Sequence, residues 1–362
     1  MDTPLFAIDN LRTYFYSRVR RAFVRSVDGA SLGVARGETL GVVGESGSGK
    51  TVAALSAAGL VSGSPGVIAG RIEFDSRNLL EGLERYAKVE ERDGRVMAVE
   101  KDESGWRRHA ETLMRRVRGK EIAMIFQNPR AALNPYSTVG AQLVEAIRLH
   151  TNHKSKAEAK ERALHWLERV RIDSPRLRFD NFPFGMSGGM CQRAMIAMAL
   201  CAEPSLLIAD EPTTGLDATI QARIVELLGE LKAETGITTM LISHDISVIR
   251  RLSDRIAVMY AGTVVETGAA AEVLRPRATQ QHPYTAALLA SVPSAETIRS
   301  KSALQAIEGE VPDTIELPRG CRFYGRCNRV TDAVRSRCAN LEPPLADVAP
   351  GHKLRCWLHA HE

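Results

Sequence analysis

The chain has 362 residues, of which 44% are hydrophobic and 25% charged, values that are ordinary for a globular protein with room for two domains. Its net charge of +5 is small and only 5% of its residues are aromatic, so the sequence offers no array of basic and aromatic side chains for nucleic acid. No apolar run reaches the ~20 residues that span a bilayer, and no signal-peptide pattern opens the chain. We therefore expect a cytoplasmic protein that reaches a membrane only through a partner.

Two strands predicted at residues 5–15 and 23–34 precede an apolar run, Leu40–Val43, that predicts a third strand. A glycine-rich stretch follows at once, and a helix is predicted from Thr51 onward. Strand, glycine-rich turn and helix at this spacing form a phosphate-binding loop, because glycines let backbone N–H groups face an anion at a helix N-terminus. The predicted nucleotide-binding residues are Gly44, Glu45, Ser46, Gly47, Ser48, Gly49, Lys50 and Thr51.

The side chains around this loop have separate expected roles. Lys50 is placed to reach the terminal phosphates of a nucleoside triphosphate, and the Thr51 hydroxyl is placed to bind Mg²⁺. An aromatic ring from the preceding strands could stack on the base. Phe23 is the first candidate and Tyr16 the second, and a half-buried strand aromatic is the simpler alternative for both.

A charged segment at about 79–119, after a strand predicted at Val67–Asp75, is additional to a minimal nucleotide-binding core. Within it, Asp93-Gly94 predicts the turn of a hairpin over Tyr86–Lys101, and Trp106–Arg118 predicts a basic helix. We expect this insertion to be an exposed, solvated excursion, with docking of a partner as the alternative.

From residue 121 onward, apolar strands alternate with helical periodicity, which predicts an α/β fold with a largely parallel, buried sheet. Helical spacing over Val139–Val170 indicates a helix-rich subdomain at about 128–200. The strands expected are Glu121–Phe126, Leu206–Ala209, Thr238–Ile242, Arg255–Met259 and Val264–Glu266, and the later helices are Thr219–Lys232 and Ile246–Leu252.

Polar residues follow several of these strands, where the sites of α/β proteins assemble. Asp210 is placed to hold Mg²⁺, and Glu211 is placed to polarise a water molecule against the γ-phosphate. Gln127 can contact both Mg²⁺ and the attacking water, and His244 can hydrogen-bond to the γ-phosphate. We therefore expect Glu211, His244 and Gln127 to be the catalytic residues, with Thr51, Asp210 and Gln127 as ligands of Mg²⁺.

The stretch Met186-Ser187-Gly188-Gly189-Met190-Cys191-Gln192-Arg193 resembles the signature of the ATP-binding cassette (ABC) ATPases. Gly215-Leu216-Asp217 resembles their D-loop, and His244 their switch histidine. The departures are Met186 in place of the usual leucine and Cys191 at a commonly polar position. The resemblance implies an ABC ATPase domain over residues 1–270, with a RecA-like parallel-sheet core, an antiparallel β subdomain and a helical subdomain.

In this family two nucleotide-binding domains form a dimer around two ATP molecules. The signature then contacts the ATP held by the opposing subunit, through helix N-terminal N–H groups and a serine hydroxyl. The resemblance therefore adds Ser187, Gly188, Gly189, Gln192 and Asp217 to the nucleotide-binding residues. It also implies a second, homologous ABC ATPase subunit as a partner.

Further stretches resemble the oligopeptide/dipeptide (and nickel) importer ATPases. They are residues 127–135, the run from His282 to Leu289, and residues 309–321, which end at Cys321. The resemblance makes 271–362 a peptide-importer extension. It implies two permease subunits, an extracytoplasmic solute-binding protein, no nucleic acid, and peripheral attachment to the cytoplasmic face of the inner membrane. The alternative is a soluble ABC ATPase for nucleic-acid maintenance, translation or metabolic complex assembly.

Four cysteines crowd the C-terminal segment, separated by five, ten and seventeen residues. Structural zinc sites usually contain pairs of cysteines separated by two to four residues, and no such pair occurs here. The longer spacing suits a larger cluster, in which each iron takes one thiolate. The resemblance to importer ATPases with C-terminal cysteines supports a 4Fe-4S cluster, with Zn²⁺ and metal-free thiols as the alternatives. The expected ligands, in a small metal-stapled appendage that has few apolar residues of its own, are Cys321, Cys327, Cys338 and Cys356.

Overall fold

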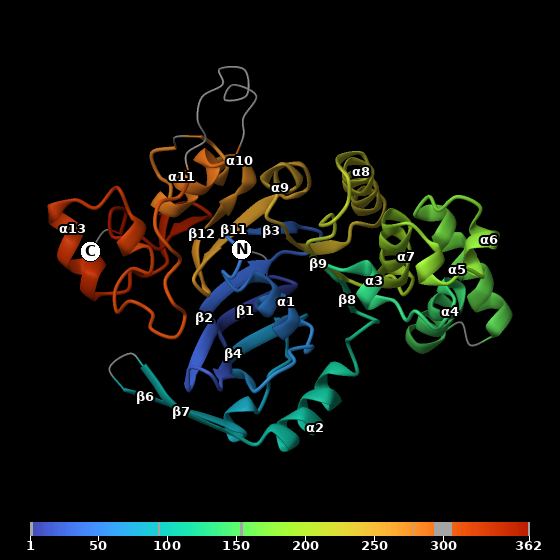
Figure 1. Ribbon diagram of the computed structural model, residues 1–362, viewed down its shortest axis with the longest axis horizontal. Coiled ribbons are helices and arrows are strands. Elements are labelled where there is room, and N and C mark those ends of the chain that lie inside the picture. Colours follow the sequence, from blue (N-terminus) through green and yellow to red (C-terminus); the bar gives the residue numbers. More distant parts are fainter. Residues whose placement is uncertain (1–2, 93–94, 153–154, 277, 293–305, 361–362) are drawn as a thin grey trace. The chain divides into compact units, whose positions relative to one another are not determined.

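The computed structural model (Figure 1) describes residues 3–92, 95–152, 155–276, 278–292 and 306–360. The chain forms two compact units. The first comprises Met1–Ala35, Thr39–Glu111 and His244–Glu362, and the second comprises Arg36–Glu38 and Thr112–Ser243.

An antiparallel sheet opens the first unit, with strand order β2-β1-β4-β5. Its apolar face includes Phe6, Ile8 and Leu11, each at most 1% exposed. The strands predicted at 5–15 and 23–34 are present, and a turn that contains Arg18, Arg20 and Arg21 joins β1 to β2. The bounds are β1 (Phe6–Ser17), β2 (Ala22–Val34), β4 (Pro65–Phe74) and β5 (Arg77–Asn78).

Five further strands of the first unit are ordered β13-β14-β12-β11-β3. Only β3 and β11 are parallel to each other; β12, β14 and β13 each pair antiparallel with their neighbours. The parallel pair is buried on both faces, which explains its unbroken apolar sequence. The bounds are β3 (Thr39–Val43), β11 (Arg255–Tyr260), β12 (Thr263–Ala269), β13 (Ala346–Ala349) and β14 (His352–Leu354), with helices α1 (Lys50–Ala57), α9 (Ile246–Leu252), α10 (Ala270–Val273) and α11 (Pro283–Ala290).

The charged insertion contains the predicted hairpin, β6 (Ala87–Arg92) with β7 (Arg95–Lys101), drawn as a separate two-stranded ribbon in Figure 1. Its expected turn, residues 93–94, lies outside the described residues. The helix, α2 (Glu103–Met114), begins and ends earlier than predicted. The insertion is not wholly solvated, because Trp106 is 9% exposed and its ring packs with those of Tyr86 and His109.

The C-terminal segment packs more closely than its composition suggests. Strand β14 pairs with β12 and so joins the sheet, and α13 (Asp332–Asn340) and a short 3-10 turn at Tyr324–Arg326 precede it. Phe323 is 2% exposed and its ring contacts those of Tyr260 and Tyr284. Although it has few apolar residues of its own, the segment therefore shares the core of the first unit.

The second unit contains three parallel strands in the order β10-β9-β8 and the helices α3 to α8 (green to yellow in Figure 1). The helical periodicity over 139–170 becomes α4 and α5. Ser155 caps α5, and Ala159, Ala163 and Trp166 recur at helical spacing on its buried face. The bounds are β8 (Ile122–Ile125), β9 (Leu206–Asp210), β10 (Thr238–Ile242), α3 (Pro129–Ala132), α4 (Val139–His150), α5 (Lys156–Arg169), α6 (Pro175–Phe179), α7 (Gly188–Leu200) and α8 (Ala218–Thr235).

Among the described residues, no helix combines the length and apolar character needed to cross a membrane.

Candidate nucleotide site

The phosphate loop of the first unit turns sharply at two glycines. Gly44 has a φ of 154° and Gly49 a φ of 99°, and a Cβ atom at these positions would lie 2.2 Å from the Met259 carbonyl oxygen and 2.3 Å from that of Ser26. Any larger residue would collide with backbone, so the packing requires glycine at both positions. Gly47 has nothing within 4 Å of its Cβ position. The outer side of the loop is therefore open to a ligand.

Lys50 begins α1 and is only 6% exposed. Its Nζ donates to the carbonyl oxygens of Gly44 (2.8 Å) and Glu45 (2.9 Å) and to Ser48 Oγ (3.2 Å). The ammonium is thus held inside the loop by oxygen acceptors, the type of atom that a phosphate also presents. Thr51 lies half-buried on the first turn of α1.

His244 and Phe23 are the remaining nucleotide contacts predicted in the first unit. His244 is exposed directly before Asp245, which caps α9. Phe23 is half-buried in β2, and its ring centroid lies 5.2 Å from that of Tyr16, which is 46% exposed. Stacking of either ring on a base stays a prediction.

The second unit brings Gln127 and Glu211 into contact across 84 residues of sequence. They follow the neighbouring parallel strands β8 and β9, whose carboxyl ends meet at one edge. Gln127 Nε2 donates to Glu211 Oε2 at 3.1 Å. Asp210, the last residue of β9, is 2% exposed. Glu211 has a φ of 46°, a left-handed conformation that costs a non-glycine residue about 1–3 kcal/mol and that recurs at functional sites.

Thr214 is a further neighbour of Glu211 that the sequence analysis does not single out. Its Oγ1 donates to the same Oε2 atom at 2.7 Å, and its backbone N–H donates to the Glu211 carbonyl. A hydroxyl three residues after the predicted catalytic Glu211, in a segment with a turn, is the signal that could have revealed it. Two neutral donors therefore fix one oxygen of the predicted base.

The signature residues open α7 as predicted. Ser187 is exposed and caps the helix, with its Oγ accepting from the Met190 N–H at 3.3 Å. Gly188 and Gly189 form the first turn. Gln192, in contrast, is 2% exposed, and its Nε2 has no hydrogen-bond partner within the part of the chain that the structure describes. The helix N-terminus is thus accessible to an anion, while the glutamine faces the interior.

Asp217 and Arg130 make two further hydrogen bonds near the signature residues of the second unit. Asp217 is exposed and caps α8, with Oδ1 accepting from the Ile220 N–H at 3.0 Å. Arg130 Nη2 donates to the Met186 carbonyl at 3.1 Å. The segment that follows Gln127 is therefore fastened to the residue that precedes the signature serine.

Sequence reasoning also missed a contact between the phosphate loop and the C-terminal segment. The Glu45 N–H donates to Tyr284 Oη at 2.7 Å, and the Glu45 carboxylate accepts two hydrogen bonds from the Arg326 guanidinium. This carboxylate raises the pKa of Arg326. Tyr284 lies in a stretch singled out for its resemblance, but no local pattern marks Arg326.

The four C-terminal cysteines line one small cavity in the first unit, together with aromatic and aliphatic side chains such as Phe323 and Trp357. Burial raises the pKa of the Cys321 thiol to about 11 and that of Cys356 to about 12, with the neighbouring cysteines adding to both shifts. Within the described residues, no three Cys, His, Asp or Glu side chains are grouped as ligands of a single metal ion. Cys191 and Cys201, in contrast, are fully buried residues of α7 and its C-terminal cap.

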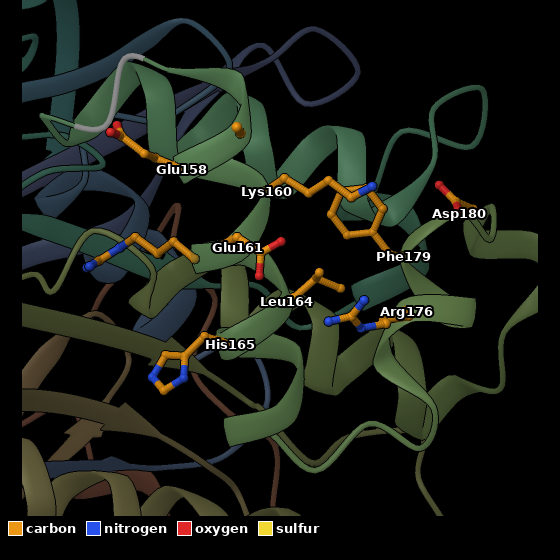
Figure 2. Close-up of a pocket in the computed structure, with 10 residues that line it drawn as sticks. Glu158, Lys160, Glu161, Leu164, His165, Arg176, Phe179 and Asp180 are labelled. Atoms are coloured by element: carbon orange, nitrogen blue, oxygen red, sulfur yellow. The ribbon is translucent and has the colours of Figure 1, made fainter.

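A broad hollow lies along α5 and α6 in the second unit, as Figure 2 shows. Charged side chains dominate its lining, among them Glu158, Glu161 and Arg176, and Lys160 lies over the Phe179 ring at 5.2 Å. None of the residues predicted to bind nucleotide lines this hollow. It therefore plays no part in the candidate site.

Residues 27–214 match the family model described as ABC transporter, and residues 265–333 match the model described as oligopeptide/dipeptide transporter, C-terminal region. The probable peptide ABC transporter ATP-binding protein y4tR of Sinorhizobium fredii is 42% identical, with 98% of this chain and 94% of the relative covered. The dipeptide transport ATP-binding protein DppD of Escherichia coli is 40% identical, covering 97% and 96%. The oligopeptide transport ATP-binding protein AppD of Bacillus subtilis is 38% identical, covering 99% and 98%.

Solved structures share the fold. The ATP-binding cassette MJ0796, determined as a dimer in a post-hydrolysis state with ADP and Pi, aligns with a TM-score of 0.58 at 23% identity, covering 73% of this chain and 98% of that one. CbiO1 from Clostridium perfringens, part of the ABC transporter complex cbiONQ, aligns with a TM-score of 0.55 at 25% identity, covering 75% and 91%.

Proposed function

The chain belongs to the ABC transporter family of ATP-binding proteins, and from this premise we propose that it is the ATP-hydrolysing, energy-coupling subunit of an importer for dipeptides, oligopeptides or similar solutes. The observation that carries the proposal is the match of residues 265–333 to the C-terminal region of oligopeptide/dipeptide transporters. This region lies beyond the ATP-binding cassette, and an ABC ATPase for nucleic-acid maintenance, translation or complex assembly has no evident need of it. Relatives named for peptide transport match nearly the whole chain, which supports the same choice.

In this proposal the first unit binds the phosphates of ATP. The open amides of the phosphate loop and the Lys50 ammonium hold the β- and γ-phosphates, and His244 hydrogen-bonds to the γ-phosphate. The buried, oxygen-bound position of Lys50 supports its role, because an ammonium already surrounded by oxygen acceptors needs little rearrangement to meet phosphate oxygens.

The second unit supplies the groups for hydrolysis. Glu211 takes a proton from the attacking water, and Gln127 and Thr214 keep its carboxylate oriented. Oxygen donors from Asp210, Gln127 and, in the first unit, Thr51 suit Mg²⁺, which prefers carboxylate, carbonyl and hydroxyl oxygen and neutralises phosphate charge when bound. The burial of Asp210 at the end of β9 supports its place among these ligands.

We propose that the chain works as one half of a nucleotide-sandwich dimer with a second, homologous ABC ATPase. Ser187 and the N–H groups of Gly188 and Gly189 cap the γ-phosphate of the partner's ATP, and Asp217 lies in the same interface. The exposed serine at the start of a 13-residue helix supports this role, since such a terminus favours an anion. Gln192 belongs to the same signature and stays a predicted nucleotide-binding residue, with its side chain 2% exposed in this structure.

Two permease subunits hold the protein at the cytoplasmic face of the inner membrane, and an extracytoplasmic binding protein delivers the solute. Apolar side chains exposed in the second unit support docking there. Tyr136 is 91% exposed in the segment after Gln127, and Phe184, 75% exposed, stacks on Phe182 just before the signature. Exposed aromatic residues of this kind are typical of interfaces.

For the C-terminal segment we propose that Cys321, Cys327, Cys338 and Cys356 hold a 4Fe-4S cluster. The lining of one cavity by all four thiols supports a shared cofactor, and their long spacing in the sequence suits a cluster better than Zn²⁺. When bound, the cluster supplies four covalent cross-links to an otherwise loop-rich segment.

The proposed role in transport is tested by purifying the full chain from detergent-solubilised membranes. The chain is expressed in its native cell with a C-terminal affinity tag. Two permease subunits and a second ABC ATPase are expected in the complex, and the complex in proteoliposomes is expected to take up labelled dipeptide when ATP is present on the side of the ATPase. Co-purification with ribosomes or DNA in place of permeases would contradict the proposal.

A further inference from the structure

Two residues of the C-terminal segment hold Glu45, the second residue of the phosphate loop. Tyr284 Oη accepts from the Glu45 N–H at 2.7 Å. Arg326 Nη1 and Nη2 donate to the two carboxylate oxygens at 2.8 and 3.1 Å, a bidentate ion pair. Such a pair fixes the orientation of a carboxylate as well as cancelling its charge.

Arg326 itself is held firmly in place. Its side chain is 6% exposed, and it also donates to the carbonyl oxygens of Ile307 and Glu308. The guanidinium carbon lies 5.9 Å from the Tyr260 ring and 6.0 Å from the Phe323 ring. Because these contacts come from the C-terminal segment and the β11 strand, the arginine keeps its position independently of Glu45.

A second arginine from the same loop reaches the other side of the phosphate loop. Arg322, 8% exposed, donates to the Ala261 carbonyl at 2.7 Å and pairs with Asp28 at 2.8 Å. The next residue, Gly262, donates its N–H to the Ser48 carbonyl at 3.0 Å. The segment 321–327, with a cysteine at each end, thus supports the phosphate loop at two places.

The charge of Glu45 makes the first support important for ATP. A carboxylate in a loop whose amides face a polyphosphate repels that ligand, and the repulsion is strong where burial limits screening. The Arg326 guanidinium cancels this charge through both carboxylate oxygens. Repulsion would return if the arginine were lost while the glutamate stayed.

We propose that Arg326 is a positioning residue for ATP, which holds the phosphate loop through Glu45 and neutralises the glutamate so that the triphosphate can bind. This inference rests on the proposed function, since it requires ATP to bind at the phosphate loop. It assigns the C-terminal segment a part in nucleotide affinity, in addition to any metal that its cysteines hold.

The test is the affinity of the full-length chain for Mg·AMP-PNP, a non-hydrolysable ATP analogue, measured by titration calorimetry. R326Q is expected to bind about tenfold more weakly than wild type at low salt, because a single unpaired charge near a polyphosphate is worth roughly 1.4 kcal/mol at intermediate dielectric. The loss is expected to shrink in high salt, where the repulsion is screened. R326K keeps the positive charge but cannot form the bidentate pair, and it is expected to lose less affinity than R326Q.

The double variant R326Q/E45Q separates charge from mere loss of packing. With both charges gone, it is expected to regain most of the affinity that R326Q loses, whereas additive losses would overturn the inference. R319Q removes an exposed arginine from the same segment and serves as the matched control. Equal binding by R326Q and wild type, or R326K as weak as R326Q, would also overturn it. A wild-type chain that binds no Mg·AMP-PNP would instead refute the proposed function.

Discussion

Glu45 in the first unit and Glu211 in the second are both acids of nucleotide-binding motifs, but their partners differ in kind. Glu45 is gripped by a guanidinium through both carboxylate oxygens. Glu211 accepts from an amide and a hydroxyl, Gln127 and Thr214, which meet at a single oxygen. The guanidinium of Arg326 cancels the negative charge of Glu45, and the amide and hydroxyl donors orient the carboxylate of Glu211.

This difference matches what each acid has to do. A carboxylate that must only shape a loop is best neutralised, because its charge would oppose the phosphates. A carboxylate that must accept a proton from water has to remain an effective base, and a cation bound to it would weaken that basicity. The comparison therefore predicts that changes around Glu45 alter nucleotide affinity, whereas changes around Glu211 alter turnover.

The largest expected effect is that of Glu211→Gln. The amide has the same shape but cannot accept the proton, so steady-state phosphate release should fall by about 100-fold or more. Nucleotide affinity should be kept, and with the natural partner subunit the variant should accumulate as an ATP-bound closed dimer. Phosphate release and the amount of dimer with ATP and Mg²⁺ are the measurements. Near-normal turnover would show that the base is assigned wrongly.

Removing the proposed cluster tests how far the four cysteines stabilise the C-terminal segment that carries Arg326. Cys338→Ser, purified without oxygen, should lose most of its bound iron, and its unfolding temperature should fall by roughly 5 °C because one cross-link to the cofactor is gone. Iron analysis and calorimetric melting measure the two effects. Cys191→Ser changes a buried cysteine of α7 and should keep its iron. Equal iron in both variants would exclude Cys338 as a ligand.

Thr214→Val should lower the maximal hydrolysis rate by about tenfold with little change in KM, because a misoriented base loses part of its advantage while nucleotide contacts stay intact. Thr214→Ser keeps the hydroxyl and should hydrolyse ATP at close to the normal rate. A rise in KM without a fall in rate would place Thr214 in nucleotide binding. It would contradict the prediction that changes around Glu211 alter turnover rather than affinity.

The two acids also show what the sequence could and could not reveal. Strands such as Thr238–Ile242 were predicted at their observed bounds because apolar runs are local signals, and the contact of Gln127 with Glu211 was foreseeable because both follow strands of a parallel sheet. The pairing of Glu45 with Arg326 spans 281 residues and has no periodic trace.

The C-terminal strands illustrate the same limit. Strand β14 has only three residues, His352–Leu354, too few for an alternating pattern to stand out, yet it pairs with β12. Packing of Phe323 against Tyr260 and Tyr284 likewise depends on chain segments that are distant in sequence. Local patterns predict elements, whereas single long-range contacts decide how a short, irregular segment packs.

The smallest expected effect concerns Lys101, a buried cation whose partners differ in kind from those of Arg326. Arg326 has a carboxylate as its partner, whereas Lys101 Nζ donates to two carbonyl oxygens, those of Pro65 and Val67, both at 2.6 Å. Burial with only neutral acceptors lowers the pKa of Lys101 from 10.5 to about 8, although the nearby Glu103 charge opposes the shift.

Because the unfolded chain binds a proton at Lys101 between pH 8 and 10.5 while the folded chain does not, this residue makes stability rise with pH across that window. Lys101→Met keeps the length of the side chain and removes the titration, so its free energy of unfolding should rise less than that of wild type between these pH values. Urea unfolding at both ends of the window measures the difference, and Lys88→Met, at an exposed lysine of the same hairpin, controls for the lost charge. If the difference between wild type and Lys101→Met is the same at both pH values, the carbonyl oxygens hold the Lys101 charge as well as water does, and burial does not lower its pKa.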